Sequence, residues 1–320
     1  MSMENLWREV AINKAGDSKG QRKMVDSLTN EAPILASAPV EASSDGLQDV
    51  YEVLTSVDSI EEGELDSPLA EVDIATRLDQ TNLRQWGALI RVGEDKLNLL
   101  KKTPQAYFAQ KTPKILTETG GRLSRTIYDN LKAYAYDNQV NKDVASRVIN
   151  ATGSNNTNYS VCAVKWVPSE ITALYNSTGW GNGKVFDIQN IGATSGGGAP
   201  ALLPDSDGVL GYGTRLKLNS GLKLANSRYV TSIVNIDKGA DFSSIGLDDK
   251  LSEIIEEARG ADVLYMHPTL KRLIGSAFKG AFTRMDMNDR GINMIVDSWD
   301  GVPIITDYNL DKGTEANVTF

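Results

Sequence analysis

The chain has 320 residues, 41% of them hydrophobic, so it can bury a sizeable core in one large domain or in two to three smaller ones. Its 33 basic against 42 acidic residues give a net charge of −9, which excludes a generally basic, nucleic-acid-binding surface. The single cysteine, Cys162, excludes an intrachain disulfide framework. There is no apolar run of about eighteen residues and no signal peptide, so we expect a soluble, folded protein made in the cytoplasm.

The first 48 residues are predicted to form an N-terminal arm that reaches away from its own body. Residues 1–30 are read as two short helices, each too short to be stable without a partner surface. Their apolar stripes are Met3, Leu6, Trp7 and Val10, and then Met24, Val25 and Leu28. Residues 31–44 contain Pro33 and Pro39 and are expected to be extended.

Residues 49–92 are predicted to form a long hairpin, because residues 49–58 and 81–92 both have strand character. Between Glu41 and Asp79 the chain carries 12 acidic residues against the single base Arg77. Such a run can be a solvated loop, or an acidic arm that docks on a basic surface of a neighbouring copy. A two-stranded ribbon cannot bury both faces alone, so the hairpin needs a neighbour.

The docking hypothesis names residues on both sides of this contact. The acidic and aromatic side of the hairpin is assigned to Glu61, Glu62, Glu64, Asp66 and Trp86. The basic side, on the neighbouring copy, is assigned to Lys96, Lys101, Lys102, Arg122 and Arg125.

Residues 93–139 are predicted to contain two helices, at 94–110 and at 112–138. Thr112 can cap the second helix and Pro113 suits its first position. At 1.5 Å per residue this helix is roughly 40 Å long, enough to cross a domain as a spine. Gly120 and Gly121 cost about 1 kcal/mol each relative to alanine, which indicates a bend or the close approach of another backbone. We take a bend as the hypothesis.

The remainder of the chain alternates between strand and helix patterns. Strands are predicted at residues 160–167, 213–218, 229–236, 262–266, 292–296 and 302–306, and helices at 168–175, 247–259 and 269–278. Residues 179–208 are rich in glycine. No internal repeat is found.

Two features have to be considered as sites of chemistry. The loop Gly192–Gly198 contains neither a GxxxxGK[ST] pattern nor a GxGxxG that opens a helix, so a surface loop is the better interpretation. His267 is the only histidine, which excludes a multi-histidine metal centre, and its place before Pro268 suits a helix-entry turn. The alternative for His267 is general-base catalysis. We expect no enzyme, no cofactor and no metal.

The segment Asp262–Leu310 resembles the core of tailed-bacteriophage major capsid proteins of the Hong Kong 97-type fold. The motifs that carry the resemblance are Met266-His267-Pro268, between a strand and a helix, and the returning strand Trp299-Asp300-Gly301-Val302-Pro303-Ile304-Ile305. The order of the other elements extends the resemblance over essentially the whole chain. It implies an α+β fold with an N-terminal arm (1–48), an E-loop hairpin (49–92), a peripheral domain with the spine helix (93–139), an axial domain (140–295) and a return to the peripheral domain (296–320).

The resemblance also implies a function and partners. The protein is expected to be a major capsid protein that self-assembles into pentamers and hexamers of an icosahedral phage head in the virion, enclosing double-stranded DNA without sequence preference. A separate scaffolding protein, a portal and a decoration protein are the other expected partners, and no membrane is involved. Two alternatives stay open: an encapsulin-type shell that encloses a cargo enzyme, and a small soluble enzyme that uses His267.

Two departures from the family pattern bear on these expectations. Many members continue beyond the position of Phe320, so this chain is either shortened or has a smaller peripheral sheet. No lysine lies between Lys23 and Lys96, so the hairpin lacks the amine that forms covalent crosslinks in the prototype of the family. We therefore expect a non-covalent shell.

Overall fold

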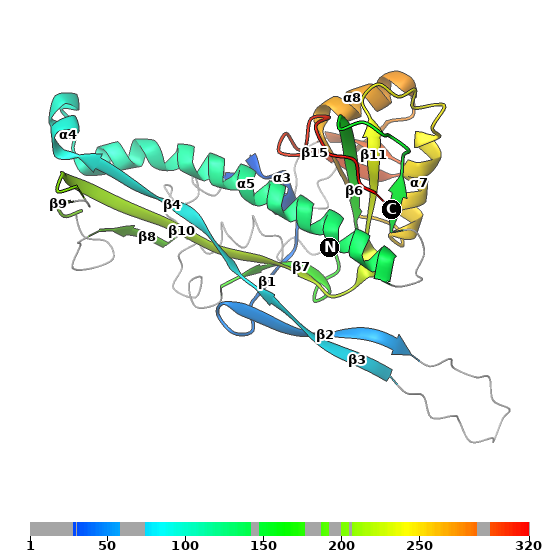
Figure 1. Cartoon of the computed structure of the whole chain (residues 1–320), viewed down its shortest axis with the longest axis horizontal. Helices are drawn as coiled ribbons and strands as arrows, with labels where there is room; N and C mark the ends of the chain where they lie inside the picture. Colours follow the sequence, from blue (N-terminus) through cyan, green and yellow to red (C-terminus); the bar gives the residue numbers. More distant parts are fainter. Residues whose placement is uncertain are drawn as a thin grey trace.

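The computed structural model describes residues 28–29, 31–57, 74–141, 147–176, 187–191, 200–204, 207–286 and 295–319. The molecule is an extended plate with a thicker body at one end, and a narrow ribbon projects from it (Figure 1). The helices are α3 (Pro33–Ser37), α4 (Glu94–Leu100), α5 (Pro104–Asn141), the 3-10 turn η2 (Ser227–Tyr229), α7 (Leu247–Glu257) and α8 (Pro268–Ala277).

The strands form three sheets. A six-stranded sheet contains β1 (Val40–Ala42), β4 (Arg84–Gly93), β7 (Ile171–Tyr175), β8 (Asp187–Asn190), β9 (Leu203–Pro204) and β10 (Leu210–Leu224). A seven-stranded sheet contains β5 (Val148–Asn150), β6 (Asn158–Val164), β11 (Val230–Asp237), β12 (Val263–Met266), β13 (Thr283–Asp286), β14 (Ile295–Trp299) and β15 (Val302–Thr306). A two-stranded ribbon contains β2 (Gln48–Val57) and β3 (Ile74–Asn82).

The helix α5 is longer than the sequence indicates and runs through the predicted boundary. The predicted start at Thr112 and Pro113 is wrong: α5 begins at Pro104 and continues for 38 residues, roughly 57 Å at 1.5 Å per residue. Pro113 removes one helical hydrogen bond, but the helix is held on both sides of it by the buried side chains of Phe108 and Leu116. The Thr112 hydroxyl bonds to the Phe108 carbonyl at 2.9 Å and does not cap a helix.

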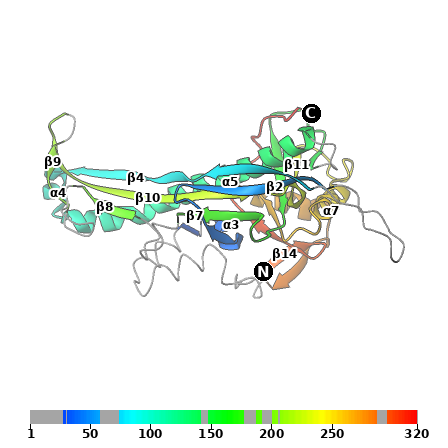
Figure 2. The same ribbon diagram turned by 90° about the horizontal axis from the view of Figure 1, so that it is seen from below.

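The six-stranded sheet forms the long part of the plate. In it β4 and β10 pair antiparallel over ten residue pairs, from Gly211 opposite Gly93 to Ser220 opposite Arg84, and run beside α5 (Figures 1 and 2). The helix predicted for residues 168–175 is wrong, because residues 171–175 are β7, which pairs with β10 and β1. The β-branched Ile171 and Thr172 are both buried there and suit a strand covered on both faces.

The seven-stranded sheet forms the thicker body and has helices on both faces. Every residue of β6 is buried, and its side chains alternate between the two faces. Cys162 and Val164 belong to the core shared with α5, whereas Tyr159, Val161 and Ala163 belong to the core shared with α7 and α8. The elements predicted at 160–167, 229–236, 247–259, 262–266, 269–278 and 302–306 are confirmed as β6, β11, α7, β12, α8 and β15.

The described part of the N-terminal arm is packed into its own body. Leu28, Ala32, Ile34 and Leu35 have no exposed surface and belong to the core against α5, so the predicted reach away from the body is wrong for this part. The extended conformation predicted for residues 31–44 is also partly wrong, since α3 starts at Pro33, where proline is well tolerated. Residues 1–27 lie outside the described residues.

The strand pairing differs from the predicted hairpin. The partner of β2 is β3, with Gln48 opposite Asn82 and Val57 opposite Ile74, so of the predicted partner strand 81–92 only Thr81 and Asn82 pair with β2. After Leu83 the chain leaves the ribbon and becomes β4 of the six-stranded sheet. The interval 140–295, expected to be an axial domain, is divided between the two larger sheets, because β7 to β10 belong to the six-stranded sheet with β4, whereas β5, β6 and β11 to β14 belong to the seven-stranded sheet of the body.

The two glycines of α5 lie where other parts of the chain cross the helix. A Cβ on Gly120 would stand 2.8 Å from the Leu28 carbonyl oxygen, and one on Gly121 would stand 2.7 Å from Asn309 Oδ1. Close approach is one of the two explanations that the sequence allowed for this pair. The bend stays a prediction.

Replacing Gly120 by alanine tests the close approach. In an unobstructed helix the change stabilises by about 1 kcal/mol, but here the new methyl group meets a backbone atom that cannot move without displacing residues 28–35. We expect Gly120→Ala to lower the free energy of unfolding, measured by urea denaturation. A gain of about 1 kcal/mol, as for an open helical glycine, would contradict the crossing.

Candidate assembly surfaces

The β2–β3 ribbon is anchored at its base and leaves its outer face exposed. Lys223 of β10 stands 3.5 Å from an Asp49 carboxylate oxygen and lies over the Tyr51 ring at 5.1 Å from its centroid. Both anchored side chains are on one face of β2. On the other face Val50 and, in β3, Leu78 are exposed, Leu78 to 74% of its surface. In the described residues each ribbon strand pairs only with the other, so both ribbon edges can accept a further strand.

A second exposed apolar surface lies at the far end of the plate. We call it the tip surface, and it consists of Leu99, Leu100, Leu203, Val209 and Leu210. The end of α4 carries the first two, and β9 with the start of β10 carries the others, all at one end of the molecule (Figures 1 and 2). Arg91 ties the strands there, since its guanidinium donates to the carbonyls of Leu203 at 2.7 Å and Val209 at 3.2 Å.

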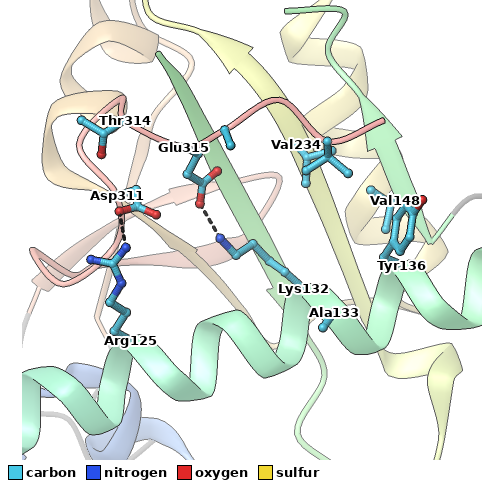
Figure 3. Close-up of a pocket in the computed structure, with 11 residues that line it drawn as sticks. Arg125, Lys132, Ala133, Tyr136, Val148, Val234, Asp311, Thr314 and Glu315 are labelled. Atoms are coloured by element: carbon cyan, nitrogen blue, oxygen red, sulfur yellow. Dashed lines mark hydrogen bonds and ion pairs between the residues drawn. The ribbon is translucent and has the colours of Figure 1, made fainter. Parts of the chain in front are cut away.

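The last described residues, 307–319, form a joint between α5 and the seven-stranded sheet, and we call them the C-terminal segment. Arg125 of α5 pairs with Asp311 at 2.8 Å, and Lys132 of α5 pairs with Glu315 (Figure 3). The Glu315 carboxylate also accepts a 2.8 Å hydrogen bond from Ser160 of β6. One acidic residue therefore connects the helix to the sheet.

The same segment is held along its length by two further contacts. The side-chain amide of Asn235, in the irregular part of β11, donates to the Val318 carbonyl and accepts from the Val318 N–H, both at 2.8 Å. The Tyr136 hydroxyl donates to the Thr319 carbonyl at 2.9 Å. An open cavity of about 580 Å³ lies between α5, β11 and the segment, and Tyr136, Val234 and Val318 are among the residues that line it (Figure 3).

The electrostatics of the joint favour a charged Lys132. Burial is the largest single effect and lowers the pKa of Lys132, but the charge and hydrogen bond of Glu315, together with neighbours such as Asp129, outweigh it, and the pKa is raised. Nearby, burial raises the pKa of the Cys162 thiol to about 11, so the thiol is neutral and unreactive at physiological pH.

Comparison with known proteins identifies the architecture. No protein-family model matches the chain, and no curated protein matches it in sequence. The capsid of bacteriophage JBD30 aligns with 92% of this chain and 94% of its own at 11% identity and a TM-score of 0.50. The JBD30 capsid decorated with minor capsid protein trimers aligns over 87% and 90% at 10% identity and a TM-score of 0.51. The chain has the Hong Kong 97-type capsid fold. The holo-SrpI encapsulin complex of Synechococcus elongatus also aligns, over 63% of this chain and 86% of its own, at 8% identity and a TM-score of 0.39.

Within this capsid fold the five basic residues of the docking hypothesis form two separate groups. Lys96, Lys101 and Lys102 lie on α4 and just beyond it, whereas Arg122 and Arg125 lie about 30 Å along α5 at 1.5 Å per residue. Three of them have partners in the same chain: Lys102 bonds to Gln110, Arg122 to Glu118 and Arg125 to Asp311. The fold does not bring all five into one patch.

The other predicted contact residues differ in how far the structure describes them. Glu61, Glu62, Glu64 and Asp66 lie outside the described residues. Trp86 lies on β4 opposite Leu218 and packs against the core under α5, so much of its indole is used inside the subunit. Its Nε1 is buried and has no hydrogen-bond partner among the described residues.

Of the two features considered for catalysis, His267 and the loop Gly192–Gly198, the structure describes His267, which has a structural role. His267 is 3% exposed and caps α8, with its Nδ1 accepting the Thr269 N–H at 3.0 Å, which confirms the helix-entry turn. Gly192–Gly198 lie outside the described residues. Over the described ranges no cluster of three or more His, Cys, Asp or Glu side chains is placed to hold a metal ion, and no helix is both long and apolar enough to cross a membrane.

Sequence reasoning missed the tip surface and the C-terminal joint. The tip had a readable signal, because Leu97, Leu99 and Leu100 cannot all face one side of a short helix. Only Leu97 is buried. The C-terminal joint had no readable signal in the sequence, since its ion pairs connect residues about 180 positions apart, such as Lys132 and Glu315 with a separation of 183.

Breaking the Lys132–Glu315 pair tests the joint. Lys132→Met keeps the helical propensity and the stem but leaves the Glu315 carboxylate, 10% exposed, without its counter-charge. We expect a loss of about 1–3 kcal/mol in the free energy of unfolding. Arg122→Met is the matched control, because its pair with Glu118 is exposed and contributes less than about 0.5 kcal/mol. Equal effects of the two changes would contradict the joint.

Proposed function

We propose that this chain is a major capsid protein that assembles into pentamers and hexamers of an icosahedral phage head enclosing double-stranded DNA. The fold supports the proposal, as do the JBD30 capsid similarities over most of both chains. The observation that carries it is the projecting β2–β3 ribbon, a two-stranded sheet that leaves Leu78 exposed to 74% of its surface. A ribbon of this kind is stable and useful when a neighbouring copy covers it.

The mechanism of such a protein is contact between copies, not catalysis. The ribbon and the tip surface lie at opposite ends of the subunit (Figure 1), so each subunit can contact different neighbours with different surfaces. Both surfaces present leucines, whose burial contributes about 25 cal/mol per Å². Many such weak contacts would together stabilise a closed shell.

The acidic connector between the ribbon strands is proposed to strengthen these contacts. Glu61, Glu62, Glu64 and Asp66 would dock on exposed bases of a neighbour, and Lys96 and Lys101 at the end of the plate are exposed. The net charge of −9 suits a container for DNA, since a shell that encloses a duplex does not need to grip its phosphates.

The proposed location is the head shell of a virion. A separate scaffolding protein, a portal and a decoration protein are proposed as partners. The JBD30 capsid is recorded as decorated with minor capsid protein trimers, which makes a decoration partner a reasonable proposal here.

Electron microscopy of the purified protein, produced with and without a phage genome, tests the function. We expect closed polyhedral particles that contain nuclease-resistant DNA when made during infection. The same particles should give a single band on a denaturing gel, because the ribbon segment has no lysine for crosslinking. Particles that contain a cargo protein and no DNA would instead support an encapsulin-type shell, and a stable monomer would contradict both.

Salt tests the electrostatic part of the assembly. Raising the salt concentration from about 0.15 M to about 1 M shortens the screening length from about 8 Å to about 3 Å. We expect capsomer association, measured by light scattering, to weaken over this range. The control is a variant in which Glu61, Glu62, Glu64 and Asp66 are replaced by Gln or Asn, which should associate more weakly and respond less to salt. Association that is unchanged by salt would remove the charge contribution.

A further inference from the structure

The cap of α8 depends on a neutral histidine. His267 follows β12 and precedes Pro268, and its Nδ1 accepts the N–H of Thr269 at 3.0 Å. An imidazole can accept at Nδ1 only when that nitrogen has a free lone pair, so the proton must be on Nε2. A protonated ring would present a second donor to the Thr269 N–H, next to the positive end of the helix.

The same ring is part of the contact between the body and the C-terminal segment. The Tyr159 ring of β6 lies 6.3 Å from the imidazole centroid, and the Tyr308 ring of the C-terminal segment lies 6.0 Å from it, edge to face. Gly313 passes directly over Tyr159, since a Cβ there would stand 2.9 Å from the Tyr159 Cζ. The imidazole is 3% exposed, so a proton that binds it brings a charge into a packed site.

The charges around the ring come from the C-terminal segment and from α8. Burial lowers the pKa of His267, and Lys312 lowers it further, whereas Asp307 and Asp311 act in the opposite direction. On α8, Lys271 contributes its N–H to the His267 carbonyl, and Arg272 is close enough to affect Tyr159. The balance favours the neutral ring.

We propose that His267 is an acid-sensitive latch, whose protonation releases the first turn of α8 and loosens the C-terminal segment that joins α5 to the body. The unfolded chain takes up the proton at about pH 6.5, before the folded chain does. The folded state therefore binds fewer protons in this range, and its stability falls as the pH drops below about 6.5. This response to pH is a property of the single subunit and does not require shell assembly.

The sequence makes this latch unusually simple to isolate. His267 is the only histidine, carboxyl groups titrate near pH 4, and the α-amino group is common to every variant. A difference in pH dependence between the wild type and a non-titrating variant between pH 7.5 and pH 5.5 therefore reports on His267.

Three forms of the full chain test the latch by urea denaturation at pH 7.5 and pH 5.5. His267→Asn keeps a capping acceptor and does not titrate, whereas His267→Ala removes the cap at every pH. At pH 7.5 we expect the wild type and His267→Asn to have the same urea midpoint of unfolding. At pH 5.5 we expect the midpoint of the wild type to fall towards that of His267→Ala. Each unit by which the folded pKa is lowered contributes up to a tenfold change in the folding constant. Parallel pH dependence of the wild type and His267→Asn would overturn the proposal.

A measurement on the wild type alone covers the case in which a variant fails to fold. Exchange of the imidazole Cε1 hydrogen, followed by mass spectrometry as a function of pH, gives the midpoint for protonation of the single histidine even in a large assembly. We expect a midpoint below 6.5, together with faster amide exchange of residues 268–277 at pH 5.5 after correction for the intrinsic rate. A midpoint at or above 6.5, or unchanged protection of α8, would overturn the latch.

Discussion

The packing of α5 against two sheets at once is the constraint on which the rest of the structure depends. One end of the helix covers β4 and β10 of the long sheet, and the other end covers β5, β6 and β11 of the body. Most of its buried residues, among them Leu116, Leu123, Tyr128 and Leu131, belong to a single core that also contains residues of both sheets. Without this shared helix each sheet would expose an apolar face to water, so the plate exists only as one unit.

Other parts of the chain are arranged around the middle of this helix. The N-terminal residue Leu28 crosses it at Gly120, and the turn at Asn309 crosses it at Gly121. Asn309 in turn donates to the Glu31 carbonyl at 2.5 Å, so the two crossing segments are bonded to each other as well as packed on the helix. Two adjacent glycines are costly in a helix, and here they make room for the backbone of Leu28 and the side chain of Asn309.

The elements that the sequence predicted well are those whose hydrophobic period agrees with their final packing. The helix α7 buries Leu247, Leu251, Ile254 and Ile255 at helical spacing, and β12 is short, apolar and fully buried. The failures occur where tertiary contacts outweigh local signals. Pro113 suggested a helix start, yet α5 continues through this residue because its neighbours on both sides are buried in the core. Local patterning also could not show that β2 pairs with β3, because register depends on which strand lies alongside.

The features of the candidate assembly surfaces also divide into some that the sequence could predict and others that it could not. That the hairpin leaves apolar side chains such as Val50 and Leu78 exposed was predictable, because a two-stranded ribbon cannot bury both of its faces. The separation of Lys96 from Arg125 was not, since it follows from the direction in which α5 runs from α4. The joint formed by Asp311 and Glu315 was invisible for a related reason: each acid is ordinary in sequence and becomes specific only beside Arg125 and Lys132.

The contacts within the subunit and its exposed apolar surfaces lie in different parts of the molecule. The ion pairs and hydrogen bonds between α5, the body and the C-terminal segment lie in the half of α5 next to the body, where they fix the helix on the seven-stranded sheet. The exposed leucines of the ribbon and the tip surface lie outside this joint, where no described part of the same chain covers them. A small change in angle at the joint would move each end by several ångströms, since the spine alone spans roughly 57 Å. Because α5 also packs on the long sheet, fixing the helix at the joint fixes the angle between the two sheets.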